Sequence, residues 1–154
     1  MSRYALRTDG GARGNPGPAG VAFVLTGPAG ETIAEAGRYI GEATNNVAEY
    51  EALLWGLRTA IGRCACPLEV YSDSELMVRQ LNGRYRVKNE GLKPLYDEAC
   101  RLMASLGDVR VVHVRREENR EADALANAAM DCRGVVGDVP LSCGDGFEQP
   151  PLFE

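Results

Sequence analysis

The sequence has no long run of apolar residues, and its first residues lack the charged-then-apolar pattern of a secretion signal. A membrane-spanning helix needs about 20 predominantly apolar residues in succession, so none is predicted. The missing signal pattern argues against an exported protein. We therefore expect a cytoplasmic protein with no membrane association.

Residues that usually bind zinc are scarce. The chain has one histidine, His113, and five cysteines, none of which form a Cys-x-x-Cys pair. Because structural zinc sites are built from such residues at close spacing, a zinc site is not expected. An odd number of cysteines cannot pair completely, so free thiols are expected, with one disulfide as the alternative.

An excess of positive charge is also missing. The 17 Lys and Arg residues are outnumbered by 22 Asp and Glu residues, which gives a net charge of −5. Proteins that hold nucleic acid through long-range electrostatics carry charge of the opposite sign. A role on nucleic acid would therefore depend on local contacts or on a bound cation.

The length of 154 residues fits one domain. The pattern predicts strands near residues 4–9, 21–25, 31–40, 68–71 and 109–114, and helices near 47–62, 72–81, 92–106 and 120–131. This order indicates an α/β fold with a five-stranded mixed sheet, in which a three-stranded antiparallel meander is joined by two parallel strands. Residues 1–132 form the predicted domain. Residues 133–154 are rich in Gly, Pro and acids without periodicity, and we expect a flexible tail there.

The stretch from Thr8 to Gly20 places Asp9 at the end of a strand, before a turn dense in Gly and Pro. Phosphate-binding loops also combine a strand with glycines, but a helix must follow the glycines directly. Pro16 and Pro18 occupy that position, and the next residues are β-rich. The stretch therefore predicts a hairpin, in which Asp9 is either an ordinary turn residue or a site residue.

Three further acids stand at comparable places. Glu49 lies early in helix 47–62 on a stripe of small residues suited to close packing on a sheet, and Asp123 lies early in the last helix. Asp73 follows the fourth strand, where Ser72 and Glu75 have capping-box spacing for the next helix. Each acid alone could simply complement a helix N-terminus. Because helix-linked strands run parallel to the first strand, Asp9 and Asp73 should end at one edge of the sheet.

Four acids converging without basic partners would repel one another and raise one another's pKa. A bound divalent cation resolves that conflict, and carboxylates without His or Cys suit Mg²⁺ or Mn²⁺. Two such ions about 4 Å apart are a known arrangement for phosphodiester cleavage. The sequence thus predicts a metal-dependent phosphodiesterase.

Five segments of the chain resemble motifs of the type-one ribonuclease H family: Thr8-Asp9-Gly10, residues 14–18, residues 44–49, Ser72-Asp73-Ser74 and residues 119–126. The resemblance implies the ribonuclease H-like fold, with Asp9, Glu49, Asp73 and Asp123 as catalytic acids that bind two Mg²⁺ ions, or Mn²⁺ in their place. The implied reaction is hydrolysis of the RNA strand of an RNA/DNA hybrid, which leaves a 3′-hydroxyl and a 5′-phosphate. The alternatives are a non-catalytic hybrid-binding module and a nuclease of the same fold with another substrate.

The resemblance also implies contacts to the substrate. The residues facing RNA 2′-hydroxyls would be Gly10, Gly11, Asn45, Glu49 and Glu75. The residues binding a DNA phosphate would be Asn15 and Thr44. The 2′-hydroxyl is the group that distinguishes RNA from DNA at such a site.

The chain departs from some relatives at two places. Residues 82–88 are too few for the basic protrusion that those relatives carry, so the chain resembles a compact branch and should bind hybrid more weakly. A loop histidine of those relatives has no counterpart between Val114 and Asp123. Residues that could act in its place or near it are Arg115, Arg116, Glu118 and Asn119, of which Asn119 can also cap the last helix. His113 itself is expected to be a packed strand residue.

The end of the chain contains Gln149, Leu152 and Phe153, which resemble the short Gln-x-x-Leu-Phe motif that docks on bacterial sliding clamps. An apolar pair on a flexible tether suits groove binding. The alternative is a plain disordered end. We otherwise expect a monomer whose partner is the RNA/DNA hybrid.

Overall fold

The computed structural model describes residues 3–138. Its strands are β1 (Tyr4–Ala12), β2 (Gly17–Thr26), β3 (Thr32–Ala43), β4 (Leu68–Ser72), β5 (Val109–His113) and β6 (Val135–Asp138). Its helices are α1 (Asn45–Gly62), α2 (Glu75–Leu81), α3 (Lys93–Leu106) and α4 (Arg120–Cys132), and a 3₁₀ turn, η1, spans Arg116–Glu118. Within the described range, no helix combines the length and apolar character needed to cross a bilayer.

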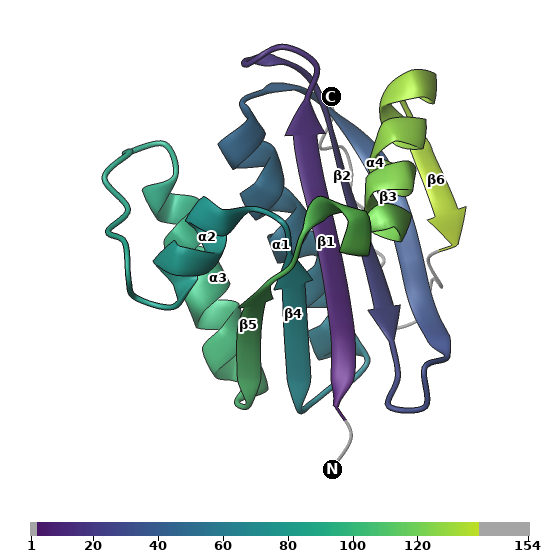
Figure 1. The fold of residues 1–154 in the computed structure, drawn as a ribbon, viewed down its shortest axis with the longest axis vertical. Helices are drawn as coiled ribbons and strands as arrows, with labels where there is room; N and C mark the ends of the chain where they lie inside the picture. The colour runs from purple at the N-terminus through teal and green to yellow at the C-terminus, as the bar shows by residue number, and fades with distance from the viewer. Residues whose placement is uncertain (1–2, 139–154) are drawn as a thin grey trace.

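The strands form one mixed sheet in the order β5-β4-β1-β2-β3-β6 (Figure 1). The first three strands are the predicted antiparallel meander, and β4 and β5 run parallel to β1 as predicted. The pairing of Thr8 with Ser72 brings the end of β4 beside Asp9, which lies within β1. The α/β fold class and the arrangement of the five predicted strands are therefore confirmed.

The sixth strand was not predicted. Residues 135–138, which we assigned to a flexible tail, pair antiparallel with β3, from Arg38 opposite Val135 to Glu35 opposite Asp138. This edge strand is short and Val135 remains 64% exposed, so no buried apolar run marks it in the sequence. The predicted clamp-binding residues Gln149, Leu152 and Phe153 lie outside the described residues.

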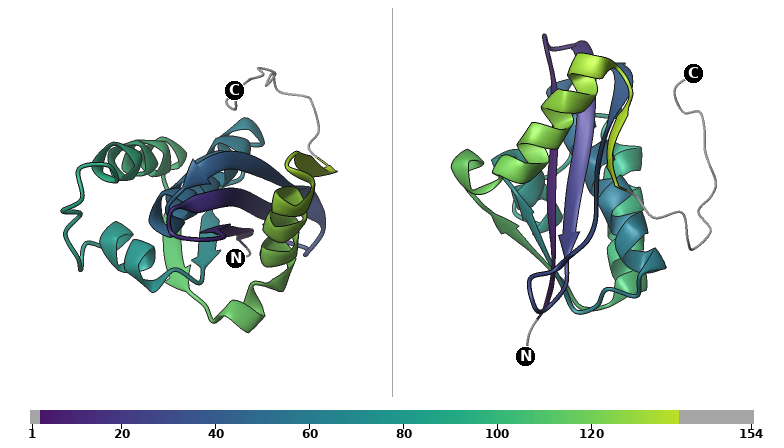
Figure 2. Two further views of the ribbon diagram at one scale, coloured as in Figure 1. Left: turned by 90° about the horizontal axis from the view of Figure 1, so that it is seen from above. Right: turned by 90° about the vertical axis from the view of Figure 1, so that its right-hand side faces the viewer.

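Helices cover the two faces of the sheet unequally. Helices α1 and α3 lie on one face and α4 lies on the other, as the right-hand view of Figure 2 shows. The larger core lies between the sheet and the α1 side, and includes Leu6, Phe23, Leu53, Leu57 and Val70. Complete burial of one such side chain contributes about 1.5–3 kcal/mol, so this layer holds α1 firmly against β1 and β2. A smaller alanine-rich cluster joins α4 to β2.

Two helix starts determine where acids of the site stand. Helix α1 begins as expected at Thr44, whose hydroxyl accepts from the Val47 N–H at 3.2 Å. Helix α2 is capped by Ser74, and the predicted capping box at Ser72 is wrong, because the Ser72 hydroxyl accepts from the Ser74 N–H instead. Two residues, Asp73 and Ser74, therefore connect the end of β4 to the start of α2.

Candidate active site

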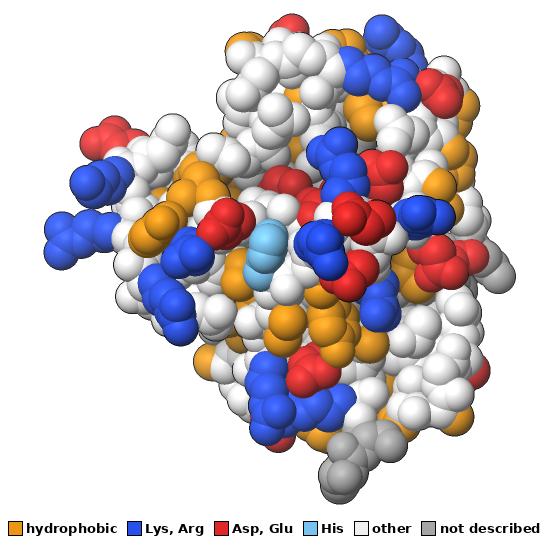
Figure 3. Space-filling model, in the orientation of Figure 1, with side chains coloured by type: hydrophobic (Ala, Val, Ile, Leu, Met, Phe, Trp, Pro, Cys, Tyr) orange, Lys and Arg blue, Asp and Glu red, His pale blue; other side chains and the backbone are white. Residues whose placement is uncertain are grey.

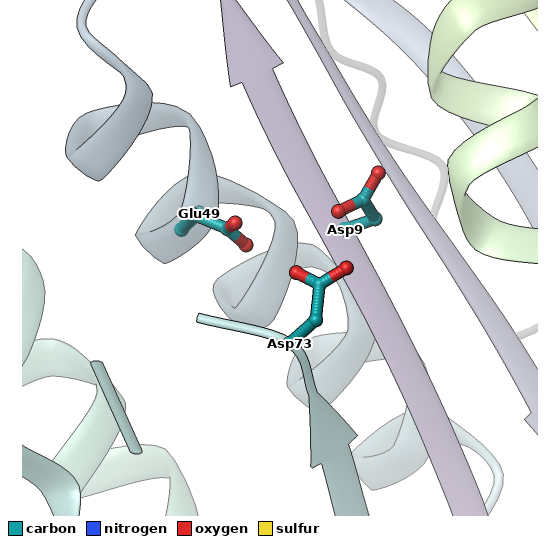
Figure 4. A group of neighbouring side chains, drawn as sticks. All are labelled: Asp9, Glu49 and Asp73. Atoms are coloured by element: carbon teal, nitrogen blue, oxygen red, sulfur yellow. The ribbon is translucent and has the colours of Figure 1, made fainter. Parts of the chain in front are cut away.

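Three acidic side chains from separate elements meet beside β1, at the level where β4 ends; Asp9 was predicted to end its strand, but β1 continues to Ala12. Asp9 comes from β1, Glu49 from α1 and Asp73 from the segment after β4, and Figure 4 shows their carboxylates turned toward one another. Each offers an oxygen atom, and these oxygens all lie within 4.8 Å of one another. Parallel pairing of β1 and β4 accounts for the placement of Asp9 beside Asp73.

Glu49 reaches this group because α1 approaches β1 unusually closely. A Cβ atom on Gly10 would lie 2.2 Å from the carbonyl oxygen of Ala48 and 2.8 Å from the backbone nitrogen of Glu49. Only a residue without a side chain permits that contact. The nearby Gly10 backbone also lowers the pKa of the Glu49 carboxyl, against the larger effect of burial. The glycine thus makes room for the third acid beside β1.

Asp123 stands at the edge of the group. It lies in the first turn of α4, raises the pKa of Asp9 through its charge, and lines the same cavity. It is not among the three acids whose oxygens lie within 4.8 Å. The cavity has a volume of about 670 Å³, and its wall also includes Gly10, Gly11, Asn45, His113, Arg115 and Arg116.

Burial and mutual repulsion make these acids hard to ionise. Burial, and next the charges of Asp73 and Asp123, raise the pKa of the Asp9 carboxyl to about 8. Burial, followed by the charges of Asp9 and Asp73, holds the pKa of Glu49 well above its ordinary value. Burial also raises the pKa of Asp73, against the opposing effects of the Arg116 charge and the nearby Asn119 amide. Full ionisation of the group therefore requires added positive charge.

Two oxygens of the group show where that charge fits. Glu49 Oε1 and Asp73 Oδ2 are buried, and neither accepts a hydrogen bond from residues 3–138. A buried carboxylate oxygen without a partner is costly, and coordination of a cation satisfies it. Three carboxylates without nitrogen or sulfur ligands suit a hard divalent metal ion. The residues present thus fit a metal-binding site.

Of the residues expected to contact substrate, some line the cavity and others lie outside its wall. Ala12 N–H donates to Asn45 Oδ1 at 2.8 Å, and Asn45 N–H donates to Asn15 Oδ1 at 3.0 Å, so the β1–β2 hairpin is tied to the start of α1 at Thr44. Gly10, Gly11 and Asn45 face the cavity. Glu75 is outside the cavity wall, and its carboxylate pairs with Arg79 at 2.6 Å.

The auxiliary candidates in the turn after β5 differ in the groups that they contact. Glu118 Oε1 accepts from the Arg115 N–H at 3.2 Å, so that carboxylate serves the turn itself. Arg115 lies 3.9 Å from Glu117. Arg116 is the cation whose charge lowers the pKa of all three clustered acids. Of the candidates, Arg116 therefore acts most directly on the site.

Asn119 and His113 are not as expected from the sequence. Asn119 precedes α4 but makes no side-chain cap; it is fully buried, and its amide donates to the Thr8 carbonyl at 2.8 Å. This bond anchors the α4 start to β1 beside Asp9. His113, expected to be packed, is exposed and lines the cavity. Its position at the end of a parallel strand, at the same edge as Asp73, was a signal that could have identified it.

The sequence also matches known proteins over most of its length. Residues 7–129 match the reverse transcriptase-like protein family. Ribonuclease HI of Halobacterium salinarum is 42% identical over 80% of this chain and 62% of its own length. A bifunctional protein of Mycobacterium tuberculosis is 44% identical over 84% of this chain. The chain spans only 36% of that mycobacterial protein, and so less than two thirds of either curated relative.

Two solved structures are similar along nearly their whole length. The crystal structure of RNase H1 from the same halophilic archaeon superposes with a TM-score of 0.82 at 41% identity, covering 84% of this chain and 98% of that one. LC11-RNase H1 in complex with RNA/DNA hybrid gives a TM-score of 0.80 at 43% identity, with the same coverage. Together with the shared fold and the clustered acids, these similarities show that the chain belongs to the type-one ribonuclease H family.

Proposed function

We propose that this protein is a metal-dependent endoribonuclease that hydrolyses the RNA strand of RNA/DNA hybrids and leaves a 3′-hydroxyl and a 5′-phosphate. The observation that carries the proposal is the buried group of Asp9, Glu49 and Asp73, with oxygens within 4.8 Å of one another and two of them lacking hydrogen-bond partners. A relative of the same family was crystallised with such a hybrid, which supports the choice of substrate.

The metal ligands proposed are Asp9, Glu49 and Asp73, with Asp123 at the edge of the site, and the ions are two Mg²⁺, with Mn²⁺ as a substitute. Such ions, when bound, activate water and stabilise negative charge on the phosphate and the leaving oxygen. The β1–β4 pairing and the close approach of α1 to β1 at Gly10 place the carboxylates for such ions. Arg116 offsets part of the negative charge from the cavity wall.

Substrate contacts are proposed along the cavity and the adjoining hairpin. Asn45 uses its side-chain oxygen to accept from Ala12, so its amide N–H groups are the ones left to donate to a 2′-hydroxyl. Gly10 and Gly11 let the backbone approach the RNA closely. Asn15 and Thr44, joined through Asn45, offer a pre-formed contact for a DNA phosphate.

Cleavage of an end-labelled hybrid in Mg²⁺ tests the proposal. Asp9→Asn and Asp73→Asn should each lower the cleavage rate at least about 100-fold. Mutation of residues that only hydrogen-bond to a metal ligand already lowers metal affinity or activity about 10–100-fold. Asp97→Asn is the matched control, since it removes one carboxylate charge from the exposed surface of α3. Parent-like activity in Asp9→Asn would refute the metal-ligand assignment.

The same assay separates the alternative functions. Hybrid binding without turnover in either Mg²⁺ or Mn²⁺ would indicate a non-catalytic binding module. Preferential cleavage of duplex RNA or duplex DNA in competition with hybrid would indicate a same-fold nuclease with another substrate.

Two further parts of the proposal concern partners and location. The Gln149, Leu152 and Phe153 motif is proposed to dock on a sliding clamp; removing residues 148–154 should abolish clamp binding, and absence of binding by the intact chain would refute it.

We propose that the protein works as a monomer in the cytoplasm. The free thiols of Cys64, Cys66, Cys100 and Cys132 are compatible with that reducing compartment.

A further inference from the structure

His113 is fixed beside the acidic group by strand pairing. It is the last residue of β5 and stands in register with Ser72, the residue before Asp73, on the neighbouring parallel strand. The Val114 N–H donates to the Ser72 carbonyl at 3.0 Å, so the two strands stay paired just past His113. The backbone therefore holds the imidazole in the wall of the cavity that contains Asp73.

The fold makes no visible use of this side chain. Val109 and Val111 of the same strand pack against the main core, whereas His113 is exposed. Among residues 3–138, no hydrogen bond or ion pair to its imidazole is present, and its interaction with Asp73 is through charge alone. Figure 3 shows the histidine in pale blue on a face that also carries acidic side chains in red. The imidazole is therefore available to a ligand in the cavity.

Two chemically different kinds of group line the cavity. The acids come from β1, α1, the segment after β4 and α4, and they would repel phosphate oxygens unless a cation lies between. The end of β5 and the turn after it contribute His113, Arg115 and Arg116. These three side chains can donate hydrogen bonds directly to phosphate oxygens.

We propose that His113 is a substrate-positioning residue that donates a hydrogen bond from a ring nitrogen to an RNA phosphate next to the one that is cleaved. This inference rests on the proposed function and adds a contact to it. A neutral imidazole already carries one N–H donor, so the contact does not need the protonated ring. His113 holds the RNA strand in place and takes no part in proton transfer.

Steady-state cleavage by His113→Ala and His113→Gln tests the contact. The alanine variant should raise KM for hybrid about 3–10-fold with kcat within about twofold, as expected for loss of binding shared by ground and transition states. Glutamine keeps an N–H donor and should recover part of that loss. Arg110→Ala is the matched control, because it removes a charged side chain from β5 about 10 Å further down the strand, outside the acidic cavity.

Modified substrates locate the phosphate. Hybrids carrying a single uncharged methylphosphonate at successive positions beside the cleavage site should show one position that raises KM for the parent. The same modification should have no added effect on His113→Ala, since both changes remove one interaction.

Three outcomes would overturn the inference. An unchanged KM in His113→Ala would show that the imidazole does not contact substrate. A loss confined to kcat, with more Mg²⁺ needed for half-maximal activity, would show that His113 acts only through Asp73. Additive effects of the modification and the variant would place the contact elsewhere. A parent protein that neither binds nor cleaves hybrid would refute the proposed function itself, which the parent control reveals separately.

Discussion

Gly10→Ala tests whether the close contact between β1 and α1 assembles the site. The added Cβ would lie 2.2 Å from the Ala48 carbonyl oxygen and 2.4 Å from its carbonyl carbon. Both are backbone atoms, so no side chain can rotate away. Restoring an ordinary 3.4 Å separation needs a shift of about 1.2 Å between strand and helix. The shift would move Glu49 away from Asp9 and Asp73.

The size of the effect follows from the packing around α1. Overpacking a tight interior contact costs about 1–3 kcal/mol, and a chain of this length loses roughly 2–4 °C in Tm per kcal/mol. A misplacement of about 1 Å at a reacting centre can lower the rate about 10²-fold. We therefore expect Gly10→Ala to lose some stability and most of its activity, with a larger loss in activity than in folding.

Thermal unfolding with and without Mg²⁺, followed by hybrid cleavage, is the assay. The parent should gain Tm on adding Mg²⁺, because an ion that binds only the folded state stabilises it. Gly10→Ala should gain much less. Gly11→Ala is the control for folding and metal binding, since its added Cβ would meet only Asn45 Oδ1, at 3.8 Å. A Gly10→Ala protein with parental Mg²⁺ stabilisation and cleavage rate would refute the reasoning.

Three further predictions concern charge, burial and binding. Because the pKa of Asp9 is raised to about 8 when folded, the metal-free folded state binds more protons than the unfolded chain between about pH 4 and pH 8, so stability falls as pH rises through that window. Urea unfolding in chelator should show the free energy of unfolding falling by a few kcal/mol from about pH 4 to pH 8, and Asp9→Asn should make this fall smaller. A parent protein whose free energy of unfolding does not change with pH would contradict the raised pKa. Asn119→Ala should cost about 1–3 kcal/mol by leaving the Thr8 carbonyl without its buried donor, whereas exposed Asn89→Ala should cost less; equal urea midpoints for the two variants would argue against the anchoring role. Hybrid affinity should depend less steeply on salt than in relatives with a basic protrusion, because fewer cations release fewer counterions, and a steeper slope would be contrary to this.

The helices, the first five strands and the strand directions were predictable because they depend on local chemistry. Alternating and helical patterns placed the first five strands and four helices, and the antiparallel or parallel sense of each strand followed from the length of its connection. Parallel direction alone was enough to place Asp9 and Asp73 at one edge. Residue type and position identified the four acids, and the family motifs supplied the substrate and the products.

Features that depend on contacts between distant segments were missed or only partly predicted. The pairing of β6 with β3 involves backbone groups that leave no pattern in the sequence. Asn119 was expected to cap a helix, as its residue type favours, but burial against Thr8 gave it a stronger partner. His113 was expected to pack, yet the end of β5 reaches the cavity and exposes it.

By itself, the sequence determined which residues could bind metal and to which strand or helix each belongs, since residue type and periodicity are local properties. Only the tertiary structure decided which acids share one cation site. It brought Glu49 through the Gly10 contact into the group and left Asp123 at its edge. The physical reason is that shared coordination depends on separations of a few ångströms, which are set by how closely backbones pack across the whole domain.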